Sequence, residues 1–110
     1  MEIQEGNKLI AEFMGLRFKD DIENGERGYL FPINGNFARR LMPAFMNYHT
    51  SWDWLMPVWY KLWYLTVPMK IDLDWARMKS GIARTILYGD NVSEVASQIV
   101  NAIQWYNTQK

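Results

Sequence analysis

The only histidine of the chain, His49, stands beside two hydroxyl groups and near a carboxylate, in the run His49-Thr50-Ser51-Trp52-Asp53. A histidine, a serine and an aspartate can build a nucleophilic site, but such triads are assembled in space rather than along the sequence. The same residue types are typical of a helix start, where a hydroxyl group caps the first turn. We therefore interpret this run as the beginning of a helix. A metal site built on two histidines is excluded.

A second candidate for chemistry is the pair Asp72 and Asp74, which lies in a segment where apolar and polar residues alternate. On a β-strand, carboxylates two residues apart share a face and lie roughly 7 Å from each other. Such a pair can bind a divalent cation or perform acid–base catalysis. Solvated aspartates on an exposed strand face are the alternative, which we favour because aspartate is usually exposed. We accordingly predict no enzyme activity, catalytic residue, metal or cofactor.

Basic residues can form a modest patch near the same segment. The candidates for nucleic-acid contacts are Arg39, Arg40, Arg77, Lys79 and Arg84. With tryptophans nearby, such a patch can bind single-stranded nucleic acid by stacking. Lys and Arg together number 12, as do Asp and Glu, so the net charge is zero. This balance argues against a nucleic-acid-binding protein and favours solvated surface charge.

Aromatic residues are concentrated in the middle of the chain, where four of the six tryptophans fall between Trp52 and Trp63. We predict a helix over 51–65, capped by Thr50 or Ser51. Its apolar stripe comprises Trp52, Leu55, Met56, Trp59, Leu62 and Trp63. Trp59 is expected to face a sheet. The opposite face carries the candidate interaction surface, which comprises Trp54, Tyr60, Lys61 and Tyr64.

The elements that must position these residues follow from periodicity. Helical spacing predicts a first helix over 2–14, ended by Gly15 in a left-handed conformation, and a last helix over 92–107. Asn91 with Glu94 predicts a cap for the last helix. Alternating apolar residues predict a β-hairpin with strands at about 69–77 and 82–88, which turns at Ser80-Gly81.

Residues 16–49 are expected to be an irregular covering segment. Within this segment we expect a third short strand near 29–31, which Pro32 would confine to an edge of the sheet. We also expect a short helix near 37–41. The predicted fold class is therefore α+β: a small antiparallel sheet packed with three helices, in a single domain over 1–110.

The chain has no cysteine, which excludes a disulfide framework and fits a reducing cytoplasm. No basic segment precedes an apolar run near the N-terminus, so we expect no signal peptide. The longest apolar stretch, Trp54 to Val67, contains Pro57 and Lys61 and is too short to span a bilayer.

Two motifs carry a resemblance: the run His49-Thr50-Ser51-Trp52-Asp53-Trp54-Leu55-Met56-Pro57-Val58, and the later run Ala102-Ile103-Gln104-Trp105-Tyr106-Asn107. Together with a first helix like residues 7–15, they resemble small proteins of phages and prophages of the Bacteroidetes group. The family is similar to what has been called a phage α-β-α sandwich domain. The resemblance covers most of the chain except residues 16–47, and it implies no activity and no catalytic residue.

These observations predict a non-enzymatic protein–protein interaction module of phage or mobile-element origin, located in the cytoplasm of a bacterial host. Its partner is expected to be a host or phage protein, or a second copy in a homodimer, because a neutral chain offers little protection from self-association. The alternative is a small nucleic-acid-binding accessory protein.

Overall fold

The computed structural model describes residues 3–16, 18–21, 26–33, 37–43, 46–89 and 91–109. The chain divides into two compact units, Met1–Asn47 and Tyr48–Lys110. The single domain predicted over 1–110 stays a prediction beside this division. No helix in the described part of the chain is both long and apolar enough to cross a membrane.

The first unit begins with helix α1 (Ile3–Phe13). Gly15 ends this helix with a φ of 78°, as predicted, because glycine enters the left-handed region without a Cβ clash. The amide of Gly15 donates to the carbonyl of Glu12, and the amide of Leu16 donates to the carbonyl of Ala11, both at 3.0 Å. These two bonds satisfy carbonyls that the helix end leaves without partners.

Three strands complete the first unit: β1 (Phe18–Asp21), β2 (Glu26–Ile33) and β3 (Phe37–Leu41). They form an antiparallel sheet in the order β1-β2-β3. Pro32 lies in the central strand, but β1 ends opposite Tyr29, so the stretch of β2 around Pro32 has β3 as its partner on one side only. Proline is tolerated there because it has no N–H to give to a second neighbour.

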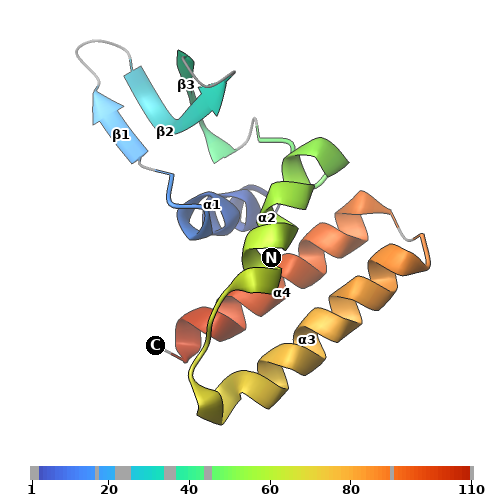
Figure 1. The fold of residues 1–110 in the computed structure, drawn as a ribbon. Helices are drawn as coiled ribbons and strands as arrows, with labels where there is room; N and C mark the ends of the chain where they lie inside the picture. The colour runs from blue at the N-terminus through green and yellow to red at the C-terminus, as the bar shows by residue number, and fades with distance from the viewer. Residues whose placement is uncertain are drawn as a thin grey trace. The chain divides into compact units, whose positions relative to one another are not determined.

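The second unit consists of three helices: α2 (Trp52–Tyr64), α3 (Met69–Leu87) and α4 (Val92–Thr108). Helices α3 and α4 run side by side in opposite directions, and α2 also packs on α4 (Figure 1). As predicted, Asn91 caps α4, because its side-chain oxygen accepts a hydrogen bond from the amide of Glu94 at 2.9 Å.

The core of the second unit is built from one face of each helix. The fully or nearly buried side chains are Leu55, Val58 and Leu62 of α2, Ile71, Trp75, Ile82 and Thr85 of α3, and Val95, Ala96, Ile99, Val100, Ala102 and Ile103 of α4. Thr85 is the polar member of this set, and its hydroxyl contacts the carbonyl of Gly81 at 3.0 Å and Gln98 Oε1 at 2.9 Å.

The predicted fold class is wrong. The segments expected to form a hairpin at 69–77 and 82–88 are one continuous helix, α3, and Ser80-Gly81 lies inside it rather than at a turn. With α3, helices make up most of the described chain. The reason is that the side chains α3 buries recur at steps of four, seven and three residues, which fits a helix and not a strand.

The expected nature of residues 16–49 is also corrected. Residues 37–41, predicted as a short helix, are strand β3, and residues 29–31 lie within β2 in a sheet that residues 69–88 do not join. Helices α1, α2 and α4 occupy the ranges in which helices were predicted.

Candidate interaction surface

The second half of α2 presents a group of large side chains to solvent. Trp63 is 42% exposed and Tyr64 is 77% exposed, and Tyr60 and Lys61 are exposed beside them. We call these four residues, Tyr60, Lys61, Trp63 and Tyr64, the aromatic surface. Their spacing of one to four residues places them within about one turn of the helix.

The orientation of α2 follows from its buried side chains. Leu55, Val58 and Leu62 are completely buried, whereas Trp59 is half-buried. Counting 100° per residue, the buried face is centred about 70° away from the predicted apolar stripe. The prediction that Trp59 faces a sheet is wrong, because the segments expected to form that sheet are helix α3. Short aliphatic side chains fit the tightly packed interior between helices, and the wider indole rings flank it.

A lysine from α3 fixes one edge of the aromatic surface. The Nζ atom of Lys79 lies 5.0 Å from the centroid of the Trp63 ring and donates a hydrogen bond of 3.0 Å to the carbonyl of Trp63. That carbonyl belongs to the last turn of α2, where carbonyls lack helical partners and a positive charge is favourable. Trp59 packs on the other side of Trp63 with ring centroids 5.5 Å apart.

Trp54, predicted as part of the interaction surface, lies apart from it. The Trp54 ring is half-buried and meets the buried ring of Tyr48 edge to face, with centroids 5.3 Å apart. Burial raises the pKa of the Tyr48 hydroxyl to about 12. Trp54 therefore has a packing role in the structure, while Tyr60, Lys61 and Tyr64 lie together at the surface.

The residues considered for catalysis lie at the start of α2 and along α3. His49 is buried, and desolvation lowers the pKa of its imidazole. Ser51 occupies the cap position of α2 without a side-chain hydrogen bond to the helix. Asp72 and Asp74 lie on a helix, where a separation of two residues turns them about 200° apart. No group of three metal-binding side chains occurs within the described ranges.

The basic residues are distributed differently from the predicted patch. Arg77 and Arg84 are exposed and share a face of α3, being seven residues apart, whereas Lys79 is engaged with Trp63. Arg39 and Arg40 are consecutive residues of β3, in the first unit. Because these two arginines belong to the first unit, no continuous basic patch is described.

Trp63, in the aromatic surface, and Lys79, which contacts it, were predicted to have other roles. Trp63 was assigned to the buried stripe, and Lys79 to a nucleic-acid patch. The signal that identifies the buried side of α2 is the set Leu55, Val58 and Leu62, which are spaced as neighbours on one helical face. This set leaves Trp63 outside the core.

Comparison of the chain with protein-family models, with curated proteins and with solved structures finds no match. The resemblance to small phage proteins therefore stays a prediction.

Proposed function

We propose that this protein is a protein-binding module that uses the aromatic surface of α2. The observation that supports the proposal most strongly is the exposure of three neighbouring aromatic rings, Tyr60, Trp63 and Tyr64. Tyrosine and tryptophan dominate the binding energy of protein interfaces, since each combines a large apolar ring with a polar group at its edge.

The contact between Lys79 and Trp63 supports the same conclusion. A side chain that is held in place before binding loses less conformational entropy when a partner arrives. Lys79 holds the Trp63 ring from one side through a cation–π contact, and Trp59 packs on that ring as well. The Trp63 ring is thereby oriented in the free protein, as expected of a surface that binds a rigid partner.

The partner that fits the resemblance is a bacterial or phage protein, or a second copy of the chain, and the proposed location is the bacterial cytoplasm. The neutral net charge supports association with a second copy, and the absence of cysteine supports the cytoplasmic location. The four residues that would contact the partner are aromatic except Lys61, so the interface would be mainly apolar.

The test uses two tyrosines of nearly equal exposure, Tyr64 at 77% and Tyr88 at 76%. Tyr88 follows the end of α3 and is not part of the aromatic surface, so it serves as the control. A photo-crosslinking amino acid at position 64 is expected to capture a defined protein or a second copy of the chain. The same amino acid at position 88 is expected to capture neither. The purified captured protein then provides a direct binding assay.

In that assay Tyr64→Ala should weaken binding by about 2 kcal/mol or more, which is roughly thirtyfold, and Tyr88→Ala should leave it unchanged. Sedimentation equilibrium of both variants measures the effect on self-association. Equal crosslinking at both positions, or equal loss of affinity in both variants, would refute the proposal. Binding of a single-stranded oligonucleotide, with an affinity that falls steeply with salt, would instead support nucleic-acid binding through Arg77 and Arg84.

A further inference from the structure

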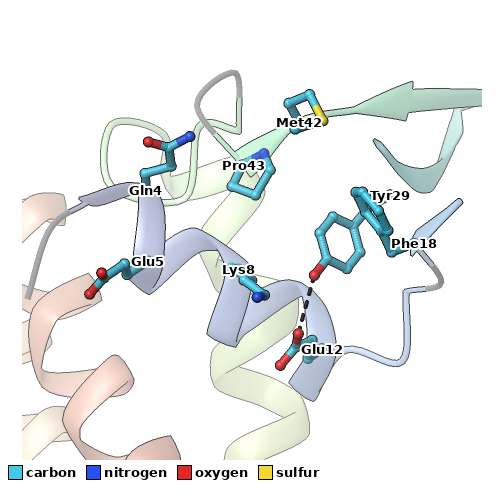
Figure 2. Close-up of a pocket in the computed structure, with 8 residues that line it drawn as sticks. All are labelled: Gln4, Glu5, Lys8, Glu12, Phe18, Tyr29, Met42 and Pro43. Atoms are coloured by element: carbon cyan, nitrogen blue, oxygen red, sulfur yellow. Dashed lines mark hydrogen bonds between the residues drawn. The ribbon is translucent and has the colours of Figure 1, made fainter. Parts of the chain in front are cut away.

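The first unit contains a cleft of about 540 Å³, which falls within the roughly 300–1,000 Å³ typical of small-molecule sites. Figure 2 shows α1 on one side of it and residues of the sheet and of the segment after β3 on the other. The lining residues are Gln4, Glu5, Lys8, Glu12, Phe18, Tyr29, Met42 and Pro43. The cleft lies entirely in the first unit and has no part in the proposed aromatic surface.

One wall of the cleft carries both signs of charge. Glu5, Lys8 and Glu12 follow one another at three and four residues, so they lie on one face of α1. Within the described residues, no ion pair joins Lys8 to either carboxylate, although the spacing would allow one. The Lys8 ammonium is therefore available at the cleft, and so is the Glu12 oxygen that the Tyr29 hydroxyl does not engage.

The facing wall is aromatic and apolar. The pairing of β1 with β2 sets Phe18 opposite Tyr29, and their rings meet at 5.2 Å with an angle of 60° between the planes. The Tyr29 hydroxyl donates a hydrogen bond of 3.2 Å to Glu12 Oε1, drawn as a dashed line in Figure 2. Burial, with a further contribution from Glu12, raises the pKa of Tyr29, so this hydroxyl keeps its proton at neutral pH.

The apolar wall is held in place by a buried amide. Asn7 is 1% exposed, and its Nδ2 donates to the carbonyl of Pro43 at 2.9 Å and to that of Met46 at 3.1 Å. Leaving those carbonyls unpaired in a buried place would be costly, so the segment after β3 is fixed against α1. The cleft is thus formed before any ligand binds.

We propose that this cleft binds a free α-amino acid with a large apolar or aromatic side chain. The ammonium group is placed at Glu12, and the carboxylate at Lys8, one turn away on the same face of α1. The ligand's side chain packs against Phe18 and Met42. Side chains three and four residues apart on a helix start about 5–6 Å from one another, so these long side chains can converge on the two charged groups of one small molecule.

The mixed charge of α1 selects this class of ligand. A simple amine would meet Lys8, and a simple carboxylic acid would meet Glu5 and Glu12. Each such meeting places like charges next to each other, which disfavours binding. A zwitterion carries a partner for each sign of charge on α1, and the Phe18 and Tyr29 rings offer an apolar contact to its side chain.

The experiment is an NMR titration of the full chain with L-phenylalanine. Three comparison ligands each lack one group: phenethylamine has no carboxylate, 3-phenylpropionate has no ammonium, and glycine has no ring. We expect saturable binding of phenylalanine with a Kd of about 1 mM or lower, and at least about tenfold weaker binding of each comparison ligand.

Two variants test the assigned groups. Lys8→Met and Glu12→Gln should each weaken phenylalanine binding by about tenfold or more, whereas Lys70→Met and Glu94→Gln, exposed positions in the second unit, should not change it. Circular dichroism of each variant confirms that it is folded. The proposal fails if phenylalanine does not bind by roughly 20 mM, if phenethylamine or 3-phenylpropionate binds as well, or if folded Lys8→Met binds like the unaltered protein.

Discussion

The second unit holds two aromatic clusters with opposite surroundings. Trp75 is completely buried and packs against two rings of α4: Trp105, stacked at 5.9 Å and 14°, and Tyr106, tilted at 5.5 Å. Tyr60, Trp63 and Tyr64 instead lie at the surface of α2, with Trp63 held by Lys79. The same kinds of side chain therefore fill the core in one place and are exposed to solvent in the other. What separates them is the helical face each occupies.

The largest expected effect comes from the buried cluster. Trp75→Ala removes a completely buried indole from a closely packed interior and should lower the free energy of unfolding by about 3–5 kcal/mol. Trp63→Ala should lower it by about 1 kcal/mol or less, because much of that ring is already in water. Urea denaturation followed by far-UV circular dichroism measures both. Equal losses would show that the two clusters do not differ as described.

The pair Tyr48 and Trp54 is intermediate between the clusters, and pH provides its test. The folded-state pKa of Tyr48, about 12, lies above the ordinary value of 10.0, so the protonated hydroxyl is favoured by folding. The contribution of this hydroxyl to the free energy of unfolding is fully present below pH 10 and is lost as pH rises towards 12. Its size is at most about 2–3 kcal/mol.

Unfolding free energies of the unaltered protein and of Tyr48→Phe, measured in urea from pH 9 to 12, determine that contribution. The phenylalanine variant has no ionisable hydroxyl at this position and should lose less stability over this window. Identical slopes for the two proteins would contradict a buried Tyr48.

The comparison also depends on α3 being one helix, since α3 supplies both Trp75 and Lys79. Gly81 lies in the middle of this helix, and a Cβ added there would meet nothing within 4 Å. Gly81→Ala should therefore raise the free energy of unfolding by about 0.5–1 kcal/mol, because alanine loses less backbone entropy in a helix. A loss of stability, as expected for a glycine in a hairpin turn, would contradict the helix.

The smallest expected effect concerns the contact that orients the exposed cluster. Lys79→Met keeps most of the aliphatic stem but removes the charge over Trp63, and should cost about 0.5 kcal/mol in stability. Arg77→Met is the control, as an exposed residue of the same helix with its charge removed. The measurement is again urea denaturation. Equal effects of the two variants would show that Lys79 does not stabilise Trp63.

Sequence patterns predicted the elements whose buried faces are simple. The last helix was predicted because Val95, Ile99 and Ile103 recur at four-residue steps, and all three are buried in α4. For α3 the pattern was ambiguous. Met69, Ile71, Leu73 and Trp75 occupy every second position, as on one face of a strand, but Met69 is 94% and Leu73 is 64% exposed. Two exposed apolar residues therefore concealed the helical spacing of the buried ones.

The sheet was harder to predict, because strand pairing joins residues that are distant in sequence. The register that sets Phe18 opposite Tyr29 depends on two segments together, and neither segment shows a regular alternation by itself. At the candidate site, Tyr60, Lys61 and Tyr64 are exposed residues of α2, and their assignment to an interaction surface stays a prediction. Trp63 was missed because hydrophobicity alone does not distinguish a buried indole from one that flanks the core.

The burial of Trp75 has an optical consequence. Its Nε1–H is buried without a hydrogen-bond partner among the described residues. An indole shielded from water in this way emits at a shorter wavelength than one in solvent, and its nearly parallel stacking on Trp105 couples the electronic transitions of the two rings. The near-UV circular dichroism of the second unit should therefore contain a signal that depends on the packing of α3 against α4. Events at the aromatic surface of α2 can then be followed separately from the integrity of the helices that carry it.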